Sequence, residues 1–242
     1  MAHGAPDDSN IVKIGDTHRV DDMAELAARL GSPVSFIRSG EVLFLDDFAC
    51  GLNGWTKTWV PADGNILPSN ERVVTGGVSG YLVSGTGANP IATLYKLFPL
   101  PTISKLGLAV TFSIGAAGRW FHFGLSYQDG LHLYVFSIRY DPGLETLGYT
   151  DIDGDPVTIA TQVILSELVN NRNILKLVID LRTGCYVRLY LNNVEYSLAG
   201  ISGQVVDEDD PARISLSCMV WGDGLAFTEL WVDSVVLTGN EF

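Results

Sequence analysis

The chain has 242 residues, of which 47% are apolar and 18% are charged. This composition excludes a disordered chain, and the length is sufficient for a large buried core. Fifteen basic against 28 acidic residues give a net charge of −13, which excludes a nucleic-acid partner because a phosphate backbone would be repelled. Apolar runs all fall short of the roughly 20 residues that a membrane-spanning helix needs, so no membrane insertion is expected.

The first forty residues differ in pattern from the rest, which predicts an N-terminal arm over 1–40 and one β domain over 41–242. Apolar residues recur at helical spacing in the arm, at Val20, Met23, Leu26, Ala27 and Leu30. This spacing predicts a short amphipathic helix at about 20–30, ended by Gly31 and Pro33. So short a helix is unstable alone. Its apolar stripe must therefore pack on its own sandwich or grip a neighbouring subunit.

The start of the chain lacks the basic and apolar segments of a secretory signal. The three cysteines of the chain, Cys50, Cys185 and Cys218, lie far apart in the sequence and form no CxxC pair. They are therefore interpreted as small apolar strand residues and not as zinc ligands. We expect a protein made in the cytoplasm, with a place on a virion surface after assembly.

From residue 41 onward the apolar period changes to two. Glu41–Leu45, Lys105–Ile114 and Ala212–Trp221 all have this alternation, and clusters of Gly, Pro, Asn and Asp separate such segments. Regularly spaced short strands with turn residues between them are typical of an antiparallel β-sandwich or barrel. The fold class is therefore all-β.

One hairpin is centred on Asp129-Gly130, a strong signal for a two-residue turn. Pairing outward from that turn sets Tyr127 opposite His132, and the face containing both is expected to lie in the core. The other face would then carry Trp120 opposite Arg139, with His122 beside them.

A second hairpin is expected between residues 175 and 196, with a tight turn at Asn192-Asn193. Six of its apolar side chains should face the core: Leu175, Leu177, Ile179, Val187, Leu189 and Leu191.

Three passages resemble the concanavalin A-like lectin/glucanase superfamily and related jelly-roll carbohydrate-binding modules. They are residues 44–55 (FLDDFACGLNGW), 178–196 (VIDLRTGCYVRLYLNNVEY) and 230–237 (LWVDSVVL). The resemblance implies an antiparallel jelly-roll β-sandwich. In some such modules acidic residues of the first and last strands hold a structural calcium, which would implicate Asp46, Asp47 and Asp233 here. The alternative is that these aspartates cap turns.

Sugar-binding sites combine an aromatic platform with a few fixed polar groups. Trp120, His122 and Arg139 on the outward face of the first hairpin are the candidates for such a glycan site. The alternative is that Arg139 simply stacks on Trp120 and that another element covers this face.

Glycosidases that this chain resembles carry a Glu-x-Asp-x-x-Glu string, which is missing from the sequence. The nearest arrangement is Asp151, Asp153 and Asp155, which read as turn acids or, less favoured, as calcium ligands. We therefore expect a protein that is not an enzyme.

Three functions follow from these patterns. The first choice is a structural protein of an assembled particle, such as a phage decoration or tail-associated subunit. It would dock through its N-terminal arm, contact glycans, and form a homo-oligomer or bind other particle subunits. The second choice is a lectin-like carbohydrate-binding module. A glycoside hydrolase of the same fold ranks last.

Overall fold

The computed structural model describes most of the chain after the arm. The described ranges are 40–61, 63–73, 77–101, 105–115, 119–168 and 171–241. The predicted helix, with Met23, Leu26, Ala27 and Leu30, lies outside them, so it and the domain boundary at residue 40 remain predictions. The described part contains no helix able to span a membrane.

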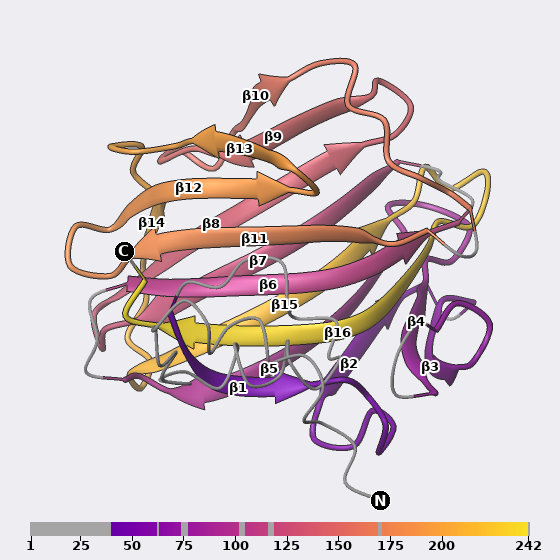
Figure 1. The fold of residues 1–242 in the computed structure, drawn as a ribbon, viewed down its shortest axis with the longest axis horizontal. Helices are drawn as coiled ribbons and strands as arrows, with labels where there is room; N and C mark the ends of the chain where they lie inside the picture. Colours follow the sequence, from indigo (N-terminus) through magenta and orange to yellow (C-terminus); the bar gives the residue numbers. More distant parts are fainter. Residues whose placement is uncertain are drawn as a thin grey trace, which may run out of the picture.

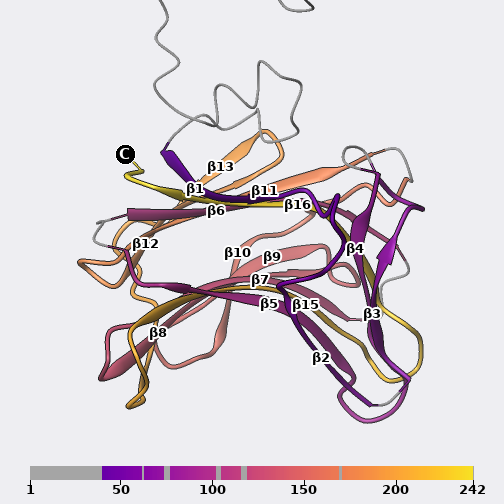
Figure 2. The ribbon, with the colours of Figure 1, turned by 90° about the horizontal axis from the view of Figure 1, so that it is seen from below.

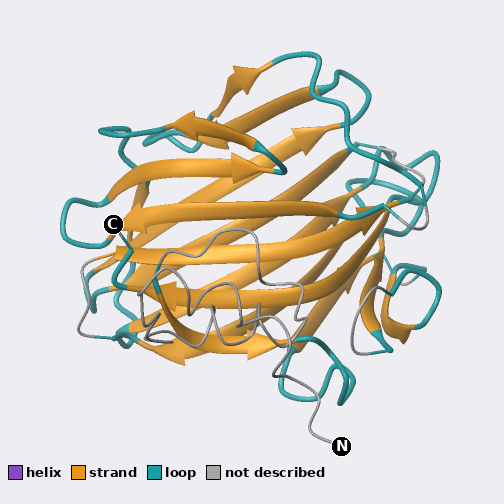
Figure 3. Ribbon diagram, viewed as in Figure 1, coloured by secondary structure: helices purple, strands orange, loops and turns teal. Residues whose placement is uncertain are grey.

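Every named element in the described ranges is a strand (Figure 3). The strands are β1 (Glu41–Asp46), β2 (Thr56–Val60), β3 (Asn65–Ser69), β4 (Ser79–Val83), β5 (Ile91–Pro99), β6 (Lys105–Ile114), β7 (Trp120–Gln128), β8 (His132–Asp141), β9 (Thr146–Thr150), β10 (Pro156–Ala160), β11 (Asn173–Asp180), β12 (Cys185–Leu191), β13 (Val194–Ser197), β14 (Gln204–Asp207), β15 (Arg213–Trp221) and β16 (Glu229–Gly239). The all-β prediction is confirmed.

The strands form two antiparallel eight-stranded sheets that lie face to face (Figures 1 and 2). The first sheet has the order β13-β12-β11-β6-β16-β4-β3, with β1 beside β16. The second has the order β10-β9-β8-β7-β15-β5-β2, with β14 beside β8. Strands far apart in sequence are neighbours in both sheets, as β6 and β16 show.

Alternate residues of the central strands fill the space between the sheets. Phe112 of β6 and Phe123 of β7 meet across it, with ring centroids 4.5 Å apart. Tyr186 of β12 is 1% exposed, and its hydroxyl crosses to the second sheet, donating to Thr150 O at 2.8 Å. Each fully buried aromatic ring contributes about 1.5–3 kcal/mol, so this layer is the main source of stability.

The second predicted hairpin is confirmed in its main features. Leu175 pairs with Leu191 and Leu177 with Leu189, all in the core, and the turn follows at Asn192 with φ of +53°. The prediction for Val187 was wrong. The register shifts between Val178 and Ile179, and this irregularity brings Tyr186 into the core in place of Val187.

The register predicted for the first hairpin was wrong by two residues. Tyr127 pairs with Tyr134 instead of His132, and the innermost pair is Gln128 with Leu133. The connection is therefore longer than two residues. Because the error is an even number, each side chain keeps its predicted face, apart from the residues of the turn itself.

Candidate functional site

The outer face of the second sheet, which points downward in Figure 2, is formed by alternate residues of β5, β7, β8 and β15. On β7, Phe121 and Phe123 are fully buried between the sheets, whereas Trp120 and His122 face outward and are half-buried. The predicted outward face is therefore present. It has three parts, which are an aromatic end, a floor of small residues and a hollow.

The aromatic end contains three rings from two strands. Trp120 of β7 pairs with Trp221 of β15, and their ring centroids lie 5.3 Å apart. The His122 ring lies 6.2 Å from Trp120 and 6.4 Å from Trp221. The sequence interpretation did not single out Trp221. Its position at the end of a strictly alternating segment was the signal that its side chain faces outward.

Two arginines pack against Trp120. The guanidinium carbons of Arg119 and Arg139 lie 3.8 Å and 3.4 Å from its ring centroid. Its indole nitrogen donates to Asp141 Oδ2 at 2.8 Å. The structure thus brings Trp120, His122 and Arg139 together, with His122 and not Trp120 opposite Arg139. Trp120 has contacts on several sides and anchors the cluster. Glycan binding by Trp120, His122 and Arg139 remains a prediction.

His122 is neutral at neutral pH. Burial, and next the positive charge of Arg139, lowers its pKa to about 4. Its Nδ1 lies 3.2 Å from the hydroxyl of Ser137, but its Nε2 is buried without a partner. The indole nitrogen of Trp221 is also buried without a partner.

The floor of the face consists of small residues from three adjacent strands. Gly124 of β7 lies between Ser137 of β8 and Ser217 of β15, and Ser126 pairs with Ser215 in another row. A Cβ at Gly124 would lie 2.5 Å from the hydroxyl of Ser217. The small side chains therefore keep the middle of the face low and supply hydroxyl groups.

A hollow of about 410 Å³ lies beyond this floor, at the opposite end from the tryptophans. It is lined by Tyr95, Leu97, Ser126, Gln128, Leu133, Glu208, Arg213 and Ser215. Gln128 is fully buried, and its Nε2 donates to the carbonyl of Glu208 while its Oε1 has no partner. Arg213 forms an ion pair with Asp210 at 2.5 Å, so its charge is compensated.

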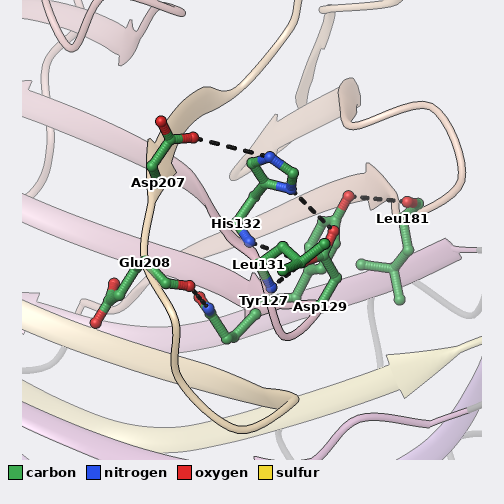
Figure 4. Close-up of polar contacts among 8 residues, drawn as sticks. Tyr127, Asp129, Leu131, His132, Leu181, Asp207 and Glu208 are labelled. Atoms are coloured by element: carbon green, nitrogen blue, oxygen red, sulfur yellow. Dashed lines mark hydrogen bonds and ion pairs between the residues drawn. The ribbon is translucent and has the colours of Figure 1, made fainter.

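The β7–β8 turn, shown in Figure 4, borders this hollow. Asp129 Oδ1 accepts hydrogen bonds from the backbone nitrogens of Leu131 and His132, both at 2.8 Å. This side-chain cap stabilises the longer turn. His132 lies 3.5 Å from Asp129 and 3.8 Å from Asp207, and its side chain is 40% exposed. Its predicted place in the core was wrong, because the longer turn moves it to the surface.

A second hollow, of about 440 Å³, lies on the other side of this turn, against the β11–β12 turn. Its lining includes Tyr127 and Tyr134, which stack with centroids 4.4 Å apart. The Tyr127 hydroxyl donates to Leu181 O at 2.9 Å, and this contact is visible in Figure 4. The polar groups named here have partners within the protein, which distinguishes this hollow from the first.

The expected calcium ligands have other contacts. Asp46 Oδ2 accepts from the indole of Trp55 at 2.8 Å and Oδ1 from Phe48 N, while Asp47 caps Ala49 N. Asp233 is 2% exposed on β16. The described ranges contain no group of three or more residues suited to a metal ion. A structural calcium at these aspartates remains a prediction.

The acids of the 151–155 segment form a turn. Asp151 Oδ1 accepts from the backbone nitrogens of Asp153 and Asp155, at 3.0 Å and 2.9 Å. This agrees with the interpretation of these residues as turn acids.

Comparison with known proteins identifies the fold and no more. No protein-family model and no curated protein matches the chain. Among solved structures, a carbohydrate esterase from the Shiga toxin-encoding bacteriophage phi24B matches with a TM-score of 0.55 and 12% identity, over 84% of this chain and 100% of that one. A Bacillus subtilis protein of unknown function with a galectin-like fold gives 0.54 and 10%, over 84% and 98%.

Peanut lectin gives a TM-score of 0.51 and 12% identity, over 82% of this chain and 97% of the lectin. A sialidase gives 0.55 and 8%, and the match covers only 19% of that larger chain. These similarities confirm the lectin-like jelly-roll β-sandwich that the sequence resemblance implied. At such low identity they show the fold and assign no activity.

Proposed function

We propose that this protein binds a neutral saccharide, without catalysis, on the outer face of its second sheet. The observation that carries the proposal is the presence of three buried, unpartnered polar atoms on this one face: His122 Nε2, Trp221 Nε1 and Gln128 Oε1. Leaving such atoms unsatisfied costs about 1–3 kcal/mol each, and a ligand that pairs with them recovers that cost. Saccharide hydroxyls both donate and accept, so one ligand type suits all three.

The charges on the face favour a neutral ligand. Arg139 lies 3.8 Å from Asp141, and Arg213 lies 2.5 Å from Asp210. Compensated arginines attract an acidic sugar weakly, and the net charge of −13 repels one. Aromatic rings, small hydroxyl side chains and a few fixed polar atoms are the usual composition of a saccharide site.

The fold supports saccharide binding without requiring it. A lectin from Bauhinia forficata, solved in complex with GalNAc, matches with a TM-score of 0.50 and 11% identity. The esterase and the sialidase with similar folds keep catalysis as an alternative. We favour binding alone because the glutamate-aspartate string of the related glycosidases is missing from the sequence.

Binding should be tested on an array of neutral oligosaccharides, with the best ligand then titrated calorimetrically. Trp221→Phe keeps an aromatic ring but removes the unpartnered donor. It should weaken binding about fivefold, which corresponds to one hydrogen bond of about 1 kcal/mol. The matched control is Trp231→Phe, since Trp231 is also buried with an unpartnered nitrogen but lies on the first sheet.

Two results would count against the proposal. One is an array on which the intact protein binds no neutral saccharide. The other is an equal loss of affinity in the two tryptophan variants, which would indicate a general effect on the fold. Release of reducing sugar from the bound oligosaccharide would instead support the enzymatic alternative.

A particle-associated structural subunit is the second candidate. It rests on the sequence interpretation of the N-terminal arm alone, because the bacteriophage protein with a similar fold is a carbohydrate esterase. Light scattering of the full chain during size exclusion should then give an oligomer. A monomer at all accessible concentrations would contradict this candidate and leave the saccharide proposal intact.

A further inference from the structure

The unpartnered polar atoms on the outer face of the second sheet, here called the saccharide face, lie at two separate ends. His122 Nε2 and Trp221 Nε1 belong to the aromatic end, whereas Gln128, which carries the unpartnered Oε1, lines the hollow of about 410 Å³. His122 and Gln128 are six residues apart on β7, and a strand rises about 3.3 Å per residue. The two ends are therefore about 20 Å apart, a distance much longer than one sugar ring.

A strip of small residues joins the two ends and runs parallel to the strands. It is formed by adjacent rows of β7 and β15: Gly124 with Ser217, and Ser126 with Ser215. Larger side chains flank this small-residue strip, namely Tyr95 and Leu97 of β5 on one side and Leu133 and Val135 of β8 on the other. The flanking strands lie three strand spacings apart, about 14 Å, so the strip is wide enough for one saccharide chain.

The unpartnered atoms require different partners at the two ends. Trp221 Nε1 is only a donor, so its partner must accept a hydrogen bond. Gln128 Nε2 donates to the carbonyl of Glu208, which can only accept, and this contact assigns the orientation of the amide. The remaining Gln128 Oε1 is an acceptor, so its partner must donate. Hydroxyl groups spaced along a saccharide chain meet both requirements.

We propose that the ligand is a linear, neutral oligosaccharide that lies along β7 and β15 and reaches from Trp221 to Gln128. A disaccharide is too short to contact both ends. The sugars at one end of the chain contact the aromatic rings, those in the middle lie over the serine hydroxyls of the strip, and the far end donates to Gln128. This inference rests on the proposed function, and it adds the length and the direction of the ligand.

The test measures affinity against chain length, with the full protein and the neutral saccharide selected on the array. Calorimetric titrations compare oligomers of that saccharide from the disaccharide to the hexasaccharide. The hexasaccharide should bind at least about fivefold more tightly than the disaccharide, because only the longer chain gains the hydrogen bond at Gln128.

Two variants place a larger side chain on the strip between the ends. Ser217→Leu should reduce the affinity for the hexasaccharide to about that for the disaccharide. The disaccharide, bound at the aromatic end, should keep its affinity and so report that the variant is folded. Ser215→Leu, one row nearer the hollow, should have the same effect. The matched control is Ser197→Leu, because Ser197 is exposed on β13 of the first sheet, and both affinities should stay unchanged.

Equal affinities for the disaccharide and the hexasaccharide would overturn this inference and leave saccharide binding at one end intact. Full hexasaccharide affinity in both Ser217→Leu and Ser215→Leu would also overturn it, because the chain would then not cross the strip. A protein that binds no neutral saccharide of any length would overturn both this inference and the proposed function.

Discussion

Removing the carboxylate of Glu241 should be among the most damaging conservative substitutions in this protein. Glu241→Gln keeps the size of the side chain but leaves Lys176 and Arg188 without their shared anion. The lysine is 1% exposed and 2.6 Å from the carboxylate, so water cannot replace the lost partner without opening the structure. Breaking a buried pair in this way costs about 3–5 kcal/mol.

Urea unfolding at neutral pH measures the effect. With an unfolding slope near 3 kcal/mol per molar urea, a loss of this size lowers the midpoint by about 1 M or slightly more. The matched control is Asp207→Asn, because Asp207 is 97% exposed and 3.8 Å from His132. An exposed pair contributes at most about 1 kcal/mol, so the control midpoint should hardly move.

A second comparison separates the charge from the packing. Replacing Lys176 and Glu241 together, in Lys176→Met with Glu241→Leu, leaves only Arg188 of the three charges. Its side chain is 18% exposed and within reach of water, so the double variant should cost less than Glu241→Gln alone. A midpoint for Glu241→Gln within the range of the Asp207 control would refute the reasoning. It would mean that water reaches the cluster in the folded protein.

Two further predictions concern groups whose burial changes their chemistry. The pKa of His122 is about 4 in the folded protein and near 6.5 in the unfolded chain. Between these values the unfolded state binds more protons than the folded state. The free energy of unfolding should therefore fall by up to about 3 kcal/mol as pH drops from 6.5 to 4. Urea unfolding across that range should show the loss in the native protein and a smaller one in His122→Gln; parallel curves would contradict it. Burial raises the pKa of the Cys218 thiol to about 12. A disulfide reagent should therefore label the exposed Cys50 and leave Cys218 unmodified in the folded protein. Equal labelling of the two cysteines would contradict this prediction.

The saccharide face shows how far local patterns reach. Alternation along β7 places Phe121 and Phe123 inward and Trp120 and His122 outward, and the structure agrees. The register error in the β7–β8 hairpin did not disturb this assignment, because pairing moved by two residues. Side-chain alternation is a property of one extended strand, so it can be seen without knowing which strand lies beside it.

The length and conformation of the β7–β8 turn could not be deduced in the same way. Asp129-Gly130 favours a two-residue connection, but the Asp129 carboxylate binds two backbone nitrogens and stabilises a longer one. His132 consequently lies at the surface, between two acids. Turn propensity describes the backbone, whereas a side-chain cap competes with it and is decided by the folded geometry.

By itself, then, the sequence determined the all-β class, the inward and outward residues of the main strands, and the resemblance to lectin-like jelly rolls. Only the tertiary structure decided which strands are neighbours, and hence that Trp221 lies beside Trp120 and that Tyr186 links the two sheets. It also decided which polar atoms are buried without a partner. These facts depend on contacts between segments distant in the chain, and no short-range periodicity records them.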